Sequence, residues 1–126
     1  MWRGDSMDNT RIQQMEALKM ADEYLKKLIP SMEEVIGELN GEEKEDTKSY
    51  LNQIIEGLNF MIETFNATSD LINEDKVVID KEEVNRAVLN LSDAIISDNY
   101  KQAATIMDSG ILPFLRKFEQ AAALYV

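Results

Sequence analysis

The chain has 126 residues, a net charge of −11, 44% hydrophobic side chains, and no cysteine or histidine. This length and composition are typical of one globular domain with a single core. Because both residue types are missing, disulfides, thiolate zinc sites, cysteine nucleophiles and histidine general bases are excluded.

Residues 1–7 precede the first periodic apolar segment of the chain. We expect them to form a disordered N-terminal extension. Residues 8–126 are then expected to form a single helical-bundle domain.

The first apolar stripe predicts a helix that ends at Asn40-Gly41. Its members are three and four residues apart, as the buried face of an amphipathic helix requires. They are Leu18, Ala21, Leu25, Leu28, Met32, Val35 and Leu39. Pro30 falls on the outer face, so we expect it to bend this helix without disturbing the stripe. The competing interpretation is a break near residues 29–31 that gives two shorter helices.

The second stripe predicts a helix that begins within the charged stretch GEEKEDTKSY, whose early acidic residues suit a helix N-terminus. The stripe consists of Leu51, Ile54, Leu58, Met61, Phe65, Thr68 and Ile72. Ile55 and Ile62 widen it, and Thr68 alone interrupts its apolar character.

The third helix has the clearest start in the sequence. Asp80 is a good N-cap, Glu83 follows three residues later, and Ile79 and Val84 occupy the two positions of a hydrophobic staple. The predicted buried face contains Val84, Val88, Leu91 and Ile95. The stretch Ser97-Asp98-Asn99 can end this helix and cap the next one.

The fourth stripe is the most regular, and it passes through the stretch SGILPF at 109–114. Its members are Tyr100, Ala104, Met107, Ile111, Phe114, Phe118, Ala121 and Tyr125. Gly110 and Pro113 both lie off the stripe, so we expect the segment to stay helical and bend around a small core. The alternative is a hinge or splayed groove that exposes Phe114, Leu115 and Phe118.

Taken together, the four segments predict an all-α fold. The expected architecture is a four-helix up-down bundle in which two helices bend at the outward-facing prolines Pro30 and Pro113.

The negative charge is concentrated in the middle of the chain. Residues 41–83 hold four basic and twelve acidic side chains, whereas residues 84–126 hold four of each. An acidic chain without a basic stripe repels phosphate groups and anionic lipid, so we expect neither nucleic acid nor a membrane as partner. No apolar run approaches the roughly 20 residues of a membrane span. The N-terminus lacks a signal-peptide core, so a cytoplasmic location is expected.

The motifs of catalysis and metal binding are incomplete in this sequence. A di-iron bundle needs Glu-x-x-His pairs, which a chain without histidine cannot supply. Residues 72–83 end like a calcium-binding loop, but Ile72, Lys76 and Val77 stand where that loop needs oxygen ligands and a glycine. No glycine-rich phosphate loop is present. We therefore expect a protein that is not an enzyme and uses no metal or cofactor.

The neutral C-terminal helix carries methionine and phenylalanine beside an acidic body. This combination predicts a protein-interaction module, either an adaptor or a small chaperone-like protein that holds a helix of its partner. The candidate partner-binding residues are Met107, Ile111, Phe114, Leu115 and Phe118.

In general layout the chain is small, acidic, all-helical and free of cysteine, and in this it resembles flagellar and type III export chaperones. It also resembles short uncharacterised helical proteins of low-GC Gram-positive bacteria. The first resemblance implies a protein that binds another protein, and the second implies a bacterial source without implying a function.

Two further hypotheses remain open. In one, the chain forms a homodimer or another homo-oligomer by pairing its C-terminal helix with that of its own copy, and loses this association when residues 116–126 are removed. In the other, a pocket between the bent helices binds a small apolar ligand, with Tyr24, Tyr50 or Tyr100 as polar handles.

Overall fold

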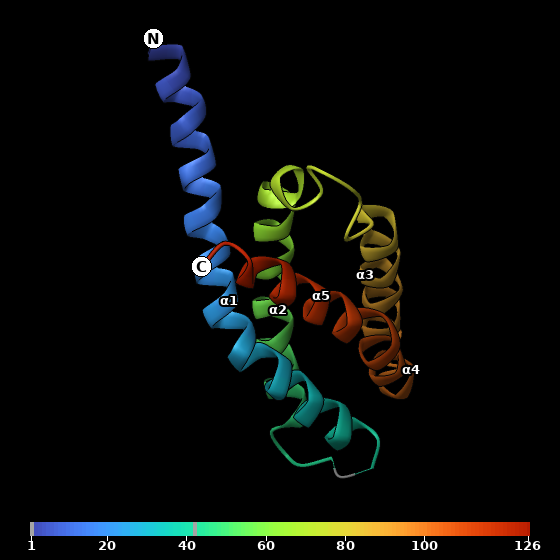
Figure 1. The fold of residues 1–126 in the computed structure, drawn as a ribbon. Helices are drawn as coiled ribbons and strands as arrows, with labels where there is room; N and C mark the ends of the chain where they lie inside the picture. Colours follow the sequence, from blue (N-terminus) through green and yellow to red (C-terminus); the bar gives the residue numbers. More distant parts are fainter. Residues whose placement is uncertain (1, 42) are drawn as a thin grey trace.

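The computed structural model describes residues 2–41 and 43–126, and it describes side chains from residue 10 onwards. Its elements are α1 (Trp2–Leu39), α2 (Thr47–Ile72), α3 (Lys81–Ile96), α4 (Tyr100–Ile106), the π-helix η1 (Met107–Ile111) and α5 (Leu112–Ala123). The predicted all-α helical bundle is confirmed (Figure 1). In the described part of the chain no helix is long and apolar enough to cross a bilayer.

The backbone of α1 is helical from Trp2 onwards, and Figure 1 shows this end of the helix standing clear of the other helices. Met1 and the side chains of residues 2–9 lie outside the described part. The division into a disordered extension over 1–7 and one domain over 8–126 stays a prediction.

Helix α1 is continuous through Pro30, so the alternative of a break near residues 29–31 is wrong. Pro30 is exposed, as predicted, and every member of the predicted stripe from Leu18 to Leu39 is buried. A proline on the outer face removes one backbone donor where water can satisfy the freed carbonyl, so the buried side of the helix is preserved. Figure 1 shows α1 curving along its length.

A buried polar contact joins the end of α1 to the start of α2. The hydroxyl of Thr47 donates to Glu38 Oε1 at 2.7 Å and accepts from the backbone N–H of Lys44 at 2.7 Å. Both side chains are buried, with 0% of Thr47 and 7% of Glu38 exposed. Because a buried polar group is costly without a partner, this pair holds the turn between the two helices.

The loop from α2 to α3 is organised by Asn73. Its Oδ1 accepts from the N–H groups of Val78 at 2.9 Å and Ile79 at 3.1 Å, while its Nδ2 donates to the carbonyl of Ile79. Asp80 then caps α3 by accepting from the N–H of Glu82 at 2.9 Å, which confirms the predicted N-cap. The loop therefore sets where α3 begins relative to α2.

The predicted fourth helix is continuous, but it contains a π-helical turn that the sequence pattern did not predict. Within η1, the N–H of Leu112 donates to the carbonyl of Met107, a bond of the i→i−5 type. Pro113 follows directly, on the exposed side of the first turn of α5. Proline has no backbone N–H, so it cannot donate to the carbonyl four residues earlier. The π-helical turn therefore lies where Pro113 interrupts the i→i−4 hydrogen bonds of the α-helix.

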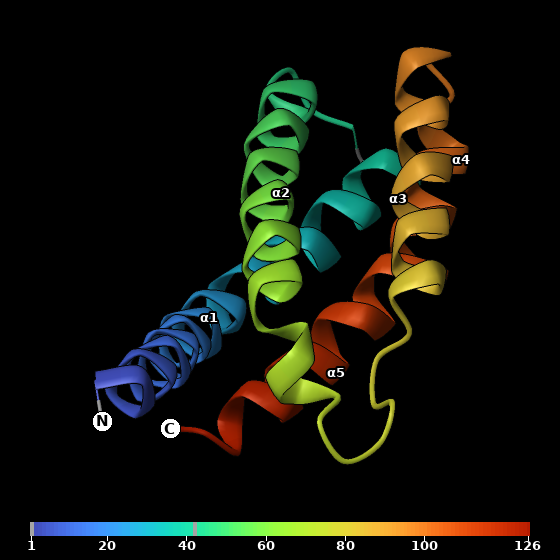
Figure 2. The same ribbon diagram turned by 90° about the horizontal axis from the view of Figure 1, so that it is seen from above.

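The helices form two pairs around a shared core. Helix α1 packs along α2, α3 packs along α4, and α5 packs against α1 and runs obliquely across α2 in both ribbon views (Figures 1 and 2). Helices α2 and α3 lie next to each other in Figure 2 but lack the extended close approach that joins α1 to α2. The closest packing is thus between α1 and α2 and between α1 and α5, and α2 and α3 are not held together in this way.

Candidate interaction groove

The five residues predicted to bind a partner lie in the core. Met107, Ile111, Leu115 and Phe118 are 0% exposed, and Phe114 is 5% exposed. This corrects the prediction that they form a partner surface, because in this conformation the chain's own helices cover them. The alternative of a splayed groove at Phe114, Leu115 and Phe118 is wrong for the same reason. A buried stripe and an interface stripe need the same residue types, so periodicity could not separate them.

Three phenylalanine rings form the centre of this core. Phe65 of α2 meets Phe114 and Phe118 of α5 edge to face, with ring centroids 5.3 Å and 5.6 Å apart. Phe114 and Phe118 stack on each other at 5.8 Å. Such geometries add to the stabilisation from buried area, so the most aromatic part of α5 holds α5 against α2.

An apolar groove with a volume of about 210 Å³ lies between α2 and α3. We call it the α2–α3 groove. It is lined by Ile55, Leu58, Asn59, Val88, Leu91, Ser92, Ile95 and Ile96. On its α3 side Ile96 is 77% exposed, and Leu89, seven residues earlier on the same helix, is 65% exposed. Contiguous exposed apolar surface of this kind marks interaction sites more often than single exposed side chains do.

The groove is open because α3 uses only part of its apolar surface inside the molecule. Val84, Leu91 and Ala94 are buried, and α3 packs on α4 and η1. The sequence placed Val88 and Ile95 in the buried face, but both are only half-buried. Residues one position further around the helix, at Leu89 and Ile96, therefore extend the apolar surface into solvent.

The α2 rim of the groove is acidic. Asn59 lines the groove, and Glu56 and Glu63 are three residues before it and four after it, so both are its neighbours on the helix surface. Both glutamates are exposed. The groove thus combines an apolar floor with a negatively charged edge on one side.

Other cavities are smaller or more polar. One of about 170 Å³ lies between the start of α3 and the π-helical turn, and its polar lining includes Asp80, Glu83, Ser109 and Lys117. Another, of about 310 Å³, lies between α3 and α4 and is lined mainly by amide, hydroxyl and carboxylate side chains. Within residues 10–41 and 43–126 no three acidic side chains converge closely enough to hold a metal ion.

The three tyrosines predicted as polar handles do not meet at one site. Tyr24 and Tyr50 line a cavity of about 160 Å³ between α1 and α2. Tyr100 lies elsewhere, with the ammonium group of Lys48 over its ring at 5.1 Å from the centroid. Only two of the three therefore share a cavity.

A family model described as "Domain of unknown function (DUF8042)" matches residues 16–121. The chain belongs to this family. No curated protein and no solved structure matches it. The DUF8042 match extends from within α1 to within α5 and contains every residue that lines the α2–α3 groove.

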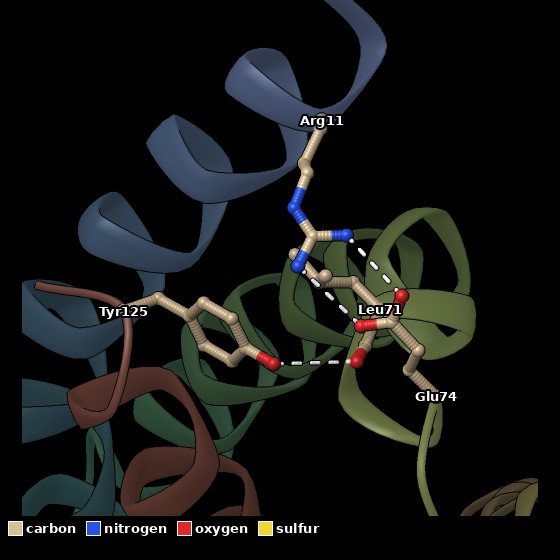
Figure 3. A network of polar contacts seen from close by, with 4 residues as sticks. All are labelled: Arg11, Leu71, Glu74 and Tyr125. Atoms are coloured by element: carbon tan, nitrogen blue, oxygen red, sulfur yellow. Dashed lines mark hydrogen bonds and ion pairs between the residues drawn. The ribbon is translucent and has the colours of Figure 1, made fainter. Parts of the chain in front are cut away.

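Two residues outside the DUF8042 match form hydrogen bonds with residues at and just after the C-terminal end of α2 (Figure 3). Arg11 donates to both carboxylate oxygens of Glu74, at 3.3 Å and 3.4 Å. The hydroxyl of Tyr125 donates to the carbonyl of Leu71 at 3.3 Å. The hydrogen bond from Arg11 to Glu74, together with the negative charge of that carboxylate, raises the pKa of Arg11. Helix α1 and the C-terminus are thus both attached to the end of α2.

The groove residues were visible in the sequence as an excess of apolar side chains. Ile55 and Ile62 widen the α2 stripe. The adjacent apolar pairs Val88-Leu89 and Ile95-Ile96 make the apolar surface of α3 broader than a single buried face requires. An amphipathic helix with one partner surface needs a stripe of about 100°. The surplus was the available signal for a second apolar surface on α2 and α3.

Proposed function

We propose that the protein is a non-enzymatic interaction module that binds an amphipathic helix of another protein in the α2–α3 groove. The observation that carries the proposal is an apolar groove between two adjacent helices, with Ile96 exposed in its lining and Leu89 exposed seven residues earlier on the same helix. A helix laid in such a groove buries its apolar face against both walls, which is an established mode of peptide recognition.

The dimensions of the groove favour a helix over a small molecule. Pockets for small ligands usually have volumes of about 300–1,000 Å³ and enclose most of the ligand. The α2–α3 groove, at about 210 Å³, falls below that range, as does the cavity at Tyr24 and Tyr50. The two walls are long helices, so a helical occupant can extend beyond the hollow and continue along them.

Burial of α5 counts against self-association through the C-terminal helix. Phe118, Ala121 and Ala122 are at most 6% exposed. Their surfaces are used within the chain. Removing residues 116–126 would therefore unfold the protein instead of separating two copies, and the deletion does not test that hypothesis.

The proposal includes an adaptor or chaperone-like role, a location in the cytoplasm and action without a cofactor. The acidic surface supports a protein partner over nucleic acid or an anionic membrane.

The test is recovery of the tagged protein from its native host, comparing the wild type with a Leu89→Asp/Ile96→Asp variant. We expect the wild type to retain one stoichiometric partner and the groove variant to lose it. Because both side chains are more than 60% exposed, the variant should melt close to the wild type. A Leu124→Asp variant is the control, since Leu124 is 82% exposed and lies outside the groove.

A photo-reactive side chain at Ser92, which lines the groove, should form a crosslink to a helical segment of that partner. The proposal is wrong if the groove variant retains the partner as well as the Leu124→Asp control does.

A further inference from the structure

We infer that the helix bound in the α2–α3 groove has a basic flank, with Lys or Arg residues seven positions apart that face Glu56 and Glu63. This inference rests on the proposed function and specifies the chemistry of the partner. It follows from the positions of acidic and basic groups around the groove.

Glu56 and Glu63 form a straight acidic line along the groove. They are seven residues apart, which is nearly two helical turns and about 10.5 Å along the axis of α2. Asp70 continues the line at the same spacing and is also exposed. A partner helix that runs beside α2 presents its own residues at the same period, so basic residues at every seventh position would face this line in register.

Among the described side chains, no ion pair neutralises this line. The ion pairs found among residues 10–41 and 43–126 use Glu74, Asp22 and Glu33, and none uses Glu56 or Glu63. Lys48 is eight residues before Glu56 on α2, and its ammonium group lies over the ring of Tyr100.

The α3 wall supplies no cation either. Arg86 is the last basic residue of α3, and it lies two positions before Val88, which places the two side chains about 160° apart around the helix. The α3 residues that line the groove are therefore apolar or uncharged, and the exposed charges Arg86 and Asp93 of α3 lie outside this lining.

The apolar walls and the acidic rim have different roles. Burial of apolar side chains supplies most of the affinity, whereas exposed ion pairs contribute little each and mainly select the partner and its register. The net charge of −11 also attracts a basic segment at long range and repels a second copy of this chain. A basic amphipathic helix is thus the occupant whose apolar face complements the walls and whose positive charges complement the acidic rim.

The experiment uses the full chain and three labelled synthetic helical peptides that share one apolar face. They differ only at two flank positions seven residues apart, which are both Lys, both Gln or both Glu. Binding is measured by fluorescence anisotropy. We expect the Lys peptide to bind about three- to tenfold more tightly than the Gln peptide, with the Glu peptide weakest. This advantage should fall as salt is raised, because exposed pairs are screened.

The protein variants assign the effect to the rim. A Glu56→Gln/Glu63→Gln variant should bind the Lys and Gln peptides equally. A Glu23→Gln/Glu34→Gln variant is the matched control, since it removes two exposed acidic groups of α1, a helix that forms neither wall of the groove. It should preserve the preference for Lys.

The outcomes separate the two proposals. If the Lys and Gln peptides bind the wild type equally, or if both double variants lose the preference to the same degree, the inference is wrong while the groove proposal stands. If no peptide binds, or if Leu89→Asp/Ile96→Asp leaves binding unchanged, the groove proposal fails as well. A dimer in sedimentation that Ile96→Asp dissociates would show that a second copy occupies the groove, and would overturn the inference.

Discussion

Phe118 and Phe60 show how position decides the contribution of one residue type. Phe118 is 0% exposed and contacts two other phenylalanine rings. Phe60, on the outer side of α2, is 41% exposed and forms a T-shaped pair with Tyr24, with ring centroids 5.9 Å apart. The sequence pattern treated Phe118 as a candidate for partner binding. In the structure it is a core residue, so its substitution acts on stability.

We predict that Phe118→Ala lowers the free energy of unfolding by about 3–5 kcal/mol, because it removes a fully buried ring and leaves a cavity. The control Phe60→Ala should cost only about 0.5–1.5 kcal/mol, which is the size of a partly exposed aromatic contact. Urea denaturation followed by circular dichroism measures both. Equal losses would contradict the assignment of Phe118 to the core.

At the scale of helices, three glycines have different environments although all lie within helical segments. A Cβ atom added at Gly37 of α1 meets no atom within 4 Å, whereas one at Gly110 in η1 lies 3.2 Å from the Cβ of Ala87 on α3. At Gly57 of α2, the added atom would clash with the hydroxyl of Tyr24. Gly110 and Gly57 are therefore sites of close approach between helices, and Gly37 is not.

These environments predict an order of stability for three alanine substitutions. Gly37→Ala should raise the free energy of unfolding by about 0.5–1 kcal/mol, since alanine favours helix and nothing opposes it. Gly110→Ala should show no such gain, because the contact with Ala87 offsets it. Gly57→Ala should be destabilising by about 1–3 kcal/mol, because Tyr24 must move. Thermal melts can rank the three, and a stabilising Gly57→Ala would refute the close approach.

At the scale of the whole molecule, the two sides of the bundle are unequally packed. Helix α2 has twelve buried residues, and α3 has three. Local opening is easiest where few apolar contacts hold an element, so the α3 side should open more readily than the α1–α2 pair. This inequality is also what leaves the α2–α3 groove available to a partner.

Native-state hydrogen exchange tests this inequality directly. We expect the amides of α3 to exchange at least about tenfold faster than those in the middle of α1 and α2, where exchange should require global unfolding. A helix bound in the groove should slow exchange in α3 selectively. Uniform protection across α1, α2 and α3 in the free protein would contradict the prediction.

Much of the fold could be predicted from local patterns. The stripe of α1, the N-cap at Asp80 and the outward placement of Pro30 and Pro113 are all confirmed. Each of these features depends on residues within about one or two helical turns of it, so it can be recognised from the sequence alone. The π-helical turn was not predicted, because its extra residue depends on how η1 packs against α3 as well as on Pro113.

The sequence by itself determined that the chain is helical, where α3 and α4 are capped, and which side chains form apolar stripes. Only the tertiary structure decided which stripe became core and which stayed open. The α5 stripe with Phe114 and Phe118 is covered by α1 and α2, whereas Leu89 and Ile96 face solvent beside the groove. The physical reason is that a side chain is buried only where another helix covers it, and the loops between the helices decide which helices become neighbours. Asn73 organises the loop from α2 to α3, and α3 packs on α4 and η1, so the surplus apolar surface on α2 and α3 stays open among the described residues.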